Sequence, residues 1–362
     1  MGCMPPPRDQ KVMAAPSPGL AHTRLEEGNV SAVREESRQG LFASTWQRHL
    51  VGLAVATLVG ALVPALVRSP RWMTAIIISF YYVMLTTGWN LTMGYTGLFS
   101  FAHVAFAAVG AYASALLALR TGLAPGLAMV AGAAVAAHGG LVVGAVCLRL
   151  RGFYLVLVTW AAAVIVQTLL QTEYRLTGGT GGLVTPPLYQ TTSQIPFYYT
   201  GLALALVSLG FLILVVDSRV GLYLRAIRDD EEAAEAMGIR TTFWKVAAFS
   251  SGALLAGVAG SFYAHYLGII DPTIASLDEM AKTILMVVVG GAGTIAGPVV
   301  GAIGVTLSQE LLRGSAADWS MVVFSVTIIV TVRFAREGLL QAAARLLSRP
   351  WTREDGRERL RS

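Results

Sequence analysis

The chain of 362 residues is poor in charge and rich in apolar side chains, since 13% of its residues are charged and 55% are hydrophobic. Soluble domains carry about a quarter charged residues, so the composition excludes an ordinary soluble protein. The formal net charge of +6 fits basic loops at a membrane surface better than nucleic-acid binding. Cys3 and Cys147 provide neither a disulfide framework nor metal-ligand spacing. The sequence therefore predicts no metal site and no cofactor.

Charged residues gather in three segments, 1–48, 217–245 and 333–362. Residues 1–48 do not resemble a signal peptide, and we expect a flexible cytoplasmic extension there. Between the charged segments lie apolar runs of about twenty residues, which is the length of a helix that spans a bilayer. The runs are 49–67, 72–91, 98–119, 124–148, 152–171, 196–216, 246–268, 280–312 and 320–338.

The run 280–312 is too long for one crossing and is interrupted at the glycine-rich stretch from Gly290 to Pro298. It predicts two shorter segments with a non-helical turn between them. The predicted fold class is an all-α, polytopic integral membrane protein with about nine to ten membrane segments and broken or re-entrant helices. A transmembrane domain, 49–340, would be followed by a charged cytoplasmic tail, 341–362.

Basic residues set the expected orientation. Placing Arg149, Arg151, the segment 217–245 and the basic C-terminal residues in the cytoplasm satisfies the positive-inside bias. Both chain ends are then cytoplasmic, which requires that 280–312 crosses twice or forms a re-entrant pair.

A first break in the apolar pattern lies at 90–103. Polar groups at membrane depth need partners from protein or from a water-filled cavity. Gly94 and Gly97 permit a turn, and Ser100 is a candidate cap for the following helix. Such a broken helix would line a transport pathway, and a purely structural kink is the alternative. The candidate pathway residues are Asn90, Gly94, Tyr95, Gly97, Ser100 and His103.

The second break comprises Gly290, Gly291, Gly293, Gly297 and Pro298. The pattern Gly291-x-Gly293-x-x-Ala296 matches a variant dinucleotide-binding fingerprint, but no βαβ unit surrounds it, so we exclude a nucleotide site. Small residues at Gly297, Gly301 and Gly304 suit close helix packing in lipid. The two breaks fall in halves that start from opposite sides of the membrane, which suggests an inverted repeat.

The segment 172–195 is rich in glycine and proline, so it cannot be a spanning helix. The orientation places it on the outer side, either as a plain linker or as a loop at the pathway mouth. Its candidate functional residues are Gly178, Gly179, Thr180 and Gly182.

The charged segment 217–245 must lie in water, because unpaired charges are costly in hydrocarbon. It predicts a short helix over 229–237, with Asp229 as N-cap, Glu232 in a capping box and Gly238 as the left-handed stop. Ala233, Ala234 and Met237 would form a small apolar patch. We interpret the segment as a docking surface for a soluble partner, with the candidate residues Arg228, Asp229, Asp230, Glu231, Glu232, Ala233, Ala234 and Gly238.

The stretch 224–239, LRAIRDDEEAAEAMGI, resembles the cytoplasmic coupling loop of ABC importer permeases and most of all the branched-chain amino-acid permease family. The resemblance extends over about 70–338. It includes GYTGLFSFAH (94–103) with GAY (110–112), RGFY (151–154), LTGGTGGL (176–183) and the turn 290–298.

This resemblance implies a non-catalytic inner-membrane subunit that helps to import leucine, isoleucine, valine or a related solute. It implies cytoplasmic ABC ATPase subunits, a second homologous permease and an extracytoplasmic solute-binding protein as partners. The chain has no GxxxxGK[ST] phosphate loop, so ATP hydrolysis is expected on the separate subunits.

Alternatives stay open. Permeases of similar architecture transport urea, a short-chain amide or a simple sugar instead of a branched-chain amino acid. An ion-coupled secondary transporter would need carboxylates within its spans, and Glu310 is the only acid well inside a run. An intramembrane enzyme is disfavoured because no His-Glu-x-x-His, Gly-x-Ser-x-Gly or paired buried carboxylates occur.

Overall fold

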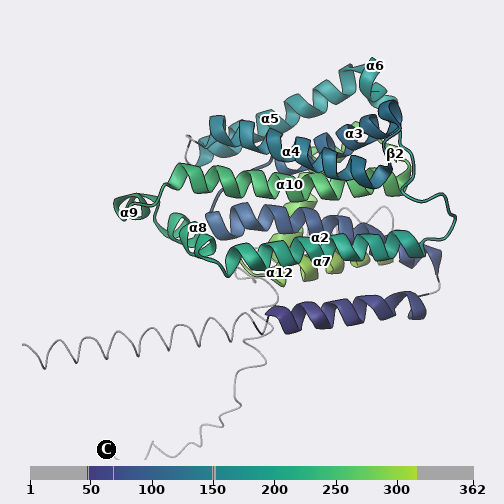
Figure 1. Ribbon diagram of the computed structural model, residues 1–362, viewed down its shortest axis with the longest axis horizontal. Helices are drawn as coiled ribbons and strands as arrows, with labels where there is room; N and C mark the ends of the chain where they lie inside the picture. Colours follow the sequence, from purple (N-terminus) through teal and green to yellow (C-terminus); the bar gives the residue numbers. More distant parts are fainter. Residues whose placement is uncertain (1–46, 48, 68, 149, 151, 316–362) are drawn as a thin grey trace, which may run out of the picture. The chain divides into compact units, whose positions relative to one another are not determined.

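The computed structural model describes residues 47, 49–67, 69–148, 150 and 152–315, which are mainly helical (Figure 1). Residues 1–46 and 48 of the predicted extension 1–48, the predicted span 320–338, the tail 341–362, Arg149 and Arg151 lie outside the described residues. Of a first unit, Met1–Gly52, only residues 47 and 49–52 are described. The fold below is that of the second unit, Leu53–Ser362.

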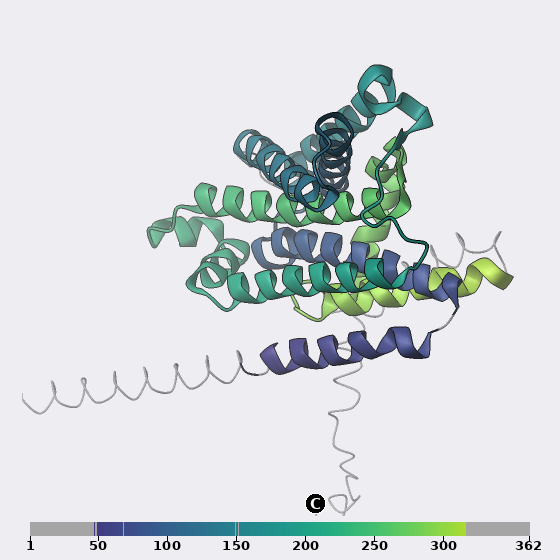
Figure 2. The same cartoon turned by 45° about the vertical axis from the view of Figure 1, so that its right-hand side comes forward.

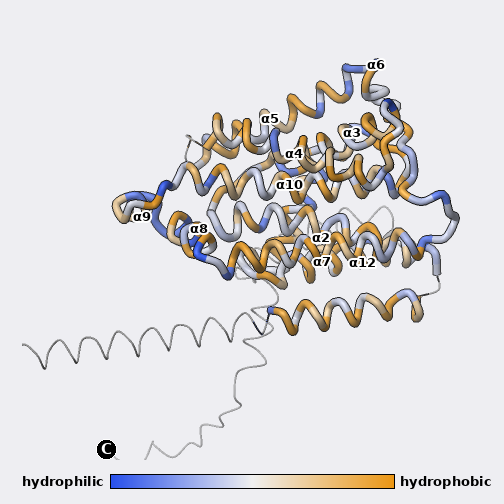
Figure 3. Tube along the Cα trace, viewed as in Figure 1, coloured by the Kyte–Doolittle hydropathy of each residue, from blue (hydrophilic) through white to orange (hydrophobic). Residues whose placement is uncertain are grey.

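Seven helices in the described residues are long and apolar enough to span a membrane. They match the first seven predicted runs, and the all-α, polytopic prediction is confirmed. Figure 3 shows these helices as largely apolar, with polar residues concentrated in the short helices and loops at their ends. The seven are His49–Leu66, α2 (Pro70–Thr96), α3 (His103–Thr121), α4 (Pro125–Cys147), α5 (Phe153–Thr172), α7 (Ile195–Val216) and α10 (Thr241–Leu267).

Proline and glycine set several helix ends. α2, α4 and α7 each carry a proline in the first turn, where the missing N–H has no intrahelical acceptor to lose. α2, α3 and α10 each end at a glycine in the left-handed conformation, namely Gly97, Gly122 and Gly268.

Of the remaining elements, the last two, α11 (Leu277–Gly290) and α12 (Gly297–Ser315), form a further helix pair that packs beside α2, and the others are short and lie at the ends of the spanning helices. These short elements are α6 (Tyr174–Thr177), η1 (Gly179–Gly181), β1 (Leu183–Val184), α8 (Arg219–Asp229), α9 (Glu231–Ala236), β2 (Ile269–Ile270) and η2 (Pro272–Ala275). β1 and β2 pair antiparallel, with Leu183 opposite Ile270. α8 and α9 lie at one end of the helices, and the loop between β1 and α7 lies at the other (Figure 1).

The run 280–312 forms two helices, α11 and α12, as the glycine-rich break predicts. α11 has 14 residues, about 21 Å at 1.5 Å per residue, which is shorter than the hydrocarbon core. Tyr82 of α2 donates to Glu279 near the start of α11 (2.8 Å), and Arg71 at the start of α2 pairs with Glu310 late in α12 (2.5 Å). Both ends of the helix pair therefore contact the N-terminal half of α2, so the run turns back on itself.

Close packing accompanies this turn. A Cβ at Gly301 would overlap the carbonyl oxygen of Met286, and one at Gly297 would overlap that of Gly291, so both glycines are needed for the approach of α11 and α12. Nothing described lies within 4 Å of a Cβ at Gly304. The packing prediction holds for Gly297 and Gly301 and stays a prediction for Gly304.

α10 is the central helix and packs against α2, α3 and α4. Figures 1 and 2 both show it between α2 on one side and the pair α3 and α4 on the other. The approach depends on small residues, because a Cβ at Gly110 would lie 2.6 Å from the Cα of Gly257, and one at Gly88 would lie 2.6 Å from the carbonyl oxygen of Gly252. Packing of small residues holds helices together in lipid, where apolar burial contributes little.

A polar anchor ties the outer loop to this core. The buried His265 of α10 lies 2.7 Å from Ser114 Oγ of α3 through Nε2. Its Nδ1 lies 2.7 Å from the carbonyl oxygen of Pro186 in the loop. Only short elements lie between α5 and α7, which confirms that 172–195 does not span the membrane. The His265 side chain adds to two backbone bonds, from the Thr185 N–H to Gly268 and from the Leu188 N–H to His265.

We expect Gly110→Leu to destabilise the protein by about 2 kcal/mol or more, because added atoms in a close-packed interface force backbones apart. The thermal midpoint of the purified protein in detergent measures this effect. Gly210→Leu in α7 is the matched control, since nothing described lies within 4 Å of a Cβ there. Equal midpoints for the two variants would contradict the packing argument.

His265→Ala removes the side chain that links the Pro186 carbonyl oxygen of the outer loop to Ser114 of α3. We expect proteinase K to cleave the loop about fivefold faster, because the loss of one hydrogen bond of about 1 kcal/mol favours local opening. Limited proteolysis of the reconstituted protein, read by mass spectrometry at 185–194, measures the rate. The control variant His138→Ala, at an exposed position of α4, should be cleaved at the wild-type rate. An unchanged rate in His265→Ala would show that backbone bonds alone hold the loop.

Candidate functional site

The first break is shorter than the sequence indicates. α2 continues to Thr96, and only 97–102 is non-helical. The break is held from both sides, because Trp89 Nε1 donates to the carbonyl oxygen of Ser100 (2.8 Å) and the Phe101 N–H donates to Thr159 Oγ1 of α5 (3.2 Å). The cap prediction is wrong, since Ala102 is the N-cap of α3 and Ser100 Oγ only accepts from the Ala102 N–H (3.1 Å).

The second break meets the last turns of α2, directly before the first break. Asn90 Nδ2 donates to the carbonyl oxygen of Thr294 (2.8 Å), and Asn90 Oδ1 accepts from the Gly293 N–H (2.8 Å). The backbones of Gly94 and Gly293 touch, because a Cβ at Gly94 would lie 2.5 Å from the Gly293 nitrogen. Asn90 is fully buried. Its side chain satisfies backbone groups of the α11–α12 turn that have no partner within a helix.

Both breaks lie at the same end of the helices, since the second contacts α2 directly before the first. An inverted repeat relates features at opposite ends of the membrane, so these two breaks are not equivalent copies. The repeat itself stays a prediction. The Gly291-x-Gly293 pattern belongs to this turn, whose flanks are the helices α11 and α12.

α8 reaches the same place with two arginines. Arg228 Nη1 donates to the carbonyl oxygen of Gly94 (2.8 Å), and its stem lies against Gly97. The Arg225 guanidinium lies over the Tyr95 ring at 5.7 Å from the centroid. We call the residues that these hydrogen bonds join the α8 junction; they are Asn90, Gly94, Arg228, Gly293 and Thr294.

The charged segment 217–245 contains two helices and the start of a third. α8 ends at Asp229, and the N-cap of α9 is Asp230, whose side chain accepts from the Glu232 and Ala233 N–H groups (3.0 Å each). The prediction of Asp229 as N-cap is therefore wrong by one residue. α10 begins at Thr241, inside the predicted loop.

The predicted stop of the short helix is confirmed. Gly238 has φ +83°, and the Ile239 and Gly238 N–H groups donate to the carbonyl oxygens of Ala234 (3.1 Å) and Glu235 (2.9 Å). These two bonds form a Schellman motif. The buried ammonium of Lys245 pairs with Glu231 at 2.5 Å and ties α9 to α10.

The apolar patch differs from its prediction. Ala234 is only 4% exposed and faces the protein. Ala233 and Ala236 are exposed, and Met237 is 83% exposed. α9 thus presents these three side chains to the surroundings, together with the exposed Glu232.

Of the other predicted pathway residues, Tyr95, Ser100 and His103 are buried, whereas Gly97 is exposed. His103 is fully buried between the rings of Phe106 and Phe249, and its Nε2 lies 3.3 Å from Thr92 Oγ1. No described residue bonds its Nδ1. The structure brings Asn90, Gly94 and Gly293 together. His103 does not join them, because it is the first residue of α3, after the non-helical stretch 97–102.

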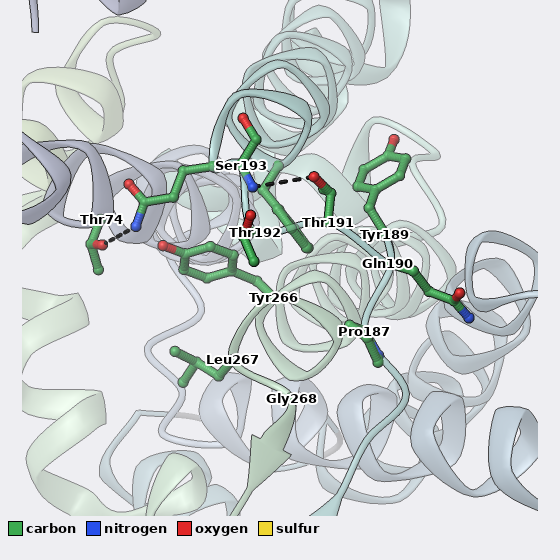
Figure 4. Close-up of a pocket in the computed structure, with 12 residues that line it drawn as sticks. Thr74, Pro187, Tyr189, Gln190, Thr191, Thr192, Ser193, Tyr266, Leu267 and Gly268 are labelled. Carbon is green, nitrogen blue, oxygen red and sulfur yellow. Dashed lines mark hydrogen bonds between the residues drawn. The ribbon is translucent and has the colours of Figure 1, made fainter. Parts of the chain in front are cut away.

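The outer loop uses its glycines for backbone geometry. Gly178, Gly179 and Gly182 all have positive φ, and a Cβ at Gly182 would lie 2.6 Å from the carbonyl oxygen of Ile270. Thr180 is exposed. Beside the loop opens a cavity of about 640 Å³, bounded by Thr74, Gln194 and Tyr266 among others (Figure 4). Gln194 Nε2 donates to Thr74 Oγ1 (2.9 Å) across its wall.

Sequence reasoning missed a charged group within the helices. Glu279 of α11 accepts from Tyr82 (2.8 Å) and from Lys282 Nζ (2.6 Å). The side chains of Glu279 and Lys282 are 21% and 31% exposed. An acid followed three residues later by a lysine inside an apolar run was the available signal.

Comparison with known proteins agrees with this architecture. The family described as "Branched-chain amino acid transport system / permease component" matches residues 71–332. The chain is 29% identical over 287 residues to the high-affinity branched-chain amino acid transport system permease protein LivM of Salmonella typhimurium, covering 72% of this chain and 67% of that protein. It is 26% identical over 292 residues to LivH of Escherichia coli, a permease protein of the same description, covering 74% and 92%.

A shorter match links the chain to the fructose import permease protein FrcC of Rhizobium meliloti, with 27% identity over 119 residues, 31% of this chain and 33% of that protein. No solved structure matches the chain. Because the family match covers well over half of the sequence, this multi-pass membrane protein belongs to the family of permease components of branched-chain amino acid transport systems.

Proposed function

We propose that the chain is the membrane subunit of an ATP-driven importer of branched-chain amino acids, with ATP hydrolysed on separate cytoplasmic ABC subunits. The observation that carries this proposal is α9, a short helix that is fixed at both ends and stands at the surface between α8 and α10. The family and the names of the relatives LivM and LivH support the substrate class.

α9 suits a mechanical contact better than a flexible loop would. A helix of six residues is marginal by itself in water. Here the Asp230 cap, the Schellman motif and the Lys245–Glu231 pair hold it. A rigid helix that exposes Ala233, Ala236 and Met237 offers a small apolar surface rimmed by acids. An ATPase that closes on ATP would push this surface and tilt the helices that flank it.

The proposed assembly has three further parts. A second homologous permease subunit completes the pathway, since both LivM and LivH resemble this chain. A solute-binding protein docks at the outer end, where Gly178, Gly179, Thr180 and Gly182 shape the loop. The chain lies in the inner membrane with both ends in the cytoplasm, as the basic residues indicate.

A simple sugar is the second candidate solute, because FrcC is named a fructose import permease and resembles part of this chain. The sequence keeps urea and short-chain amides open as well. In each case the mechanism is the same, and the binding protein would supply most of the specificity.

Met237→Asp should abolish co-purification with the ATPase subunits, because a charge replaces an apolar side chain that is 83% exposed on α9. Pull-down of the tagged permease from solubilised membranes measures the complex. Val184→Asp is the matched control, since Val184 is 70% exposed at the opposite end. Equal recovery of ATPase with both variants would contradict docking at α9.

Proteoliposomes that contain the permease, its sister subunit and the ATPase should take up labelled leucine only with ATP and the binding protein. Labelled leucine, fructose and urea are compared in the same vesicles. Uptake of fructose or urea in place of leucine would move the assignment to the second candidate. Uptake driven by an ion gradient without ATP would overturn the mechanism.

A further inference from the structure

The α8 junction joins three parts of the chain that are far apart in sequence. α2 contributes Asn90 and Gly94, the α11–α12 turn contributes Gly293 and Thr294, and α8 contributes Arg228. Three hydrogen bonds of 2.8 Å connect them. α8 is also the helix that directly precedes α9, with only Asp230 between the two.

The contact between α2 and the turn is rigid. A Cβ at Gly293 would lie 3.0 Å from the carbonyl oxygen of Gly94, so the two backbones already touch. Asn90 lies one turn earlier on α2 and binds the turn through both ends of its amide. Moving the turn away from α2 would leave a buried amide unpaired, which is costly inside a membrane protein. The two breaks must therefore move together.

The contact of α8 is easier to break. In a continued helix the Leu98 N–H would bond to the carbonyl oxygen of Gly94, but it bonds to that of Thr92 instead (3.0 Å). Arg228 supplies the missing donor to Gly94. Its side chain is 41% exposed and also contacts Asp229 (3.2 Å), so water can replace the bond at modest cost. Such a bond can form in one state of a cycle and break in another.

Packing makes α8 move as a body. Gly221, Leu224 and Ile227 are its buried residues, and Leu224 packs in one cluster with Leu91 and Tyr95 of α2. A push on α9 therefore reaches α2 through this apolar face. Arg228 adds a polar link at the point where α2 meets the α11–α12 turn.

We propose that the α8 junction transmits the displacement of α9 to the α11–α12 turn, with Arg228 and Asn90 as positioning residues. The proposal rests on the function proposed above and names the route by which the ATP cycle reaches the helix pair. α11 carries Glu279 and Lys282 at its other end, so movement of the turn displaces this charged group within the helices.

The test compares uptake with ATP hydrolysis in the complete complex. In Arg228→Met and in Asn90→Ala, the labelled leucine transported per ATP hydrolysed should fall about tenfold, a typical size for a coupling between sites. The double variant should be no worse than either single one, because both remove the same connection. Arg228→Lys keeps one donor and should recover part of the transport.

Arg219→Met is the matched control, since Arg219 is an exposed arginine in the first turn of α8. It should transport normally. Normal leucine per ATP in Arg228→Met would overturn the proposal, and so would loss of the ATPase from this variant alone, which would make Arg228 a docking contact. A wild-type complex that takes up no solute with ATP would remove the proposed function itself, a result that the variants cannot produce.

Discussion

The interior of a membrane offers no water to bond with, and this constraint explains most of the polar contacts in the structure. Each helix break frees backbone groups that need partners from the protein. Asn90 supplies them for the α11–α12 turn, while Trp89 and Thr159 supply them for the break after α2. His265 does the same for the outer loop through Pro186. The irregular segments are therefore specified as firmly as the helices, and each one is tied to a neighbouring span.

The second organising feature is the presence of glycines, which have no side chain, at the points where helices cross. α10 can lie at the centre because glycines face each other at its crossings with α2 and α3, as at Gly88 with Gly252 and Gly110 with Gly257. Such crossings bring backbones into contact and leave little room for one helix to rotate against the next. Movement in this core is better described as tilting of packed groups, which suits a mechanism driven from one end by α9.

The sequence predicts the helices well because their length and apolarity are local properties. It also predicts the turn within 280–312 and the stop at Gly238, since glycine has few other reasons to stand at these positions. It misplaces the N-cap of α9 by one residue, because Asp229 and Asp230 have the same capping side chain. Only the residue at which α8 ends determines which of the two caps α9. It does not predict that Asn90 binds Gly293, because no local pattern encodes a contact between residues 203 positions apart. The sequence does not predict the hydrogen bond from Tyr82 to Glu279 for the same reason.

The acids inside the helical domain bear on the source of energy. A carboxylate that carries a coupling ion must be able to gain and lose that ion during transport. Glu310, the acid that the sequence left as the best candidate, is bound by Arg71 at both its side chain and its carbonyl oxygen. Glu279 already has a tyrosine and a lysine as partners. Acids held in this way are poor carriers for an ion. These contacts favour the proposal that energy is delivered from the cytoplasmic side through α9, in which the α8 junction has a role beyond packing.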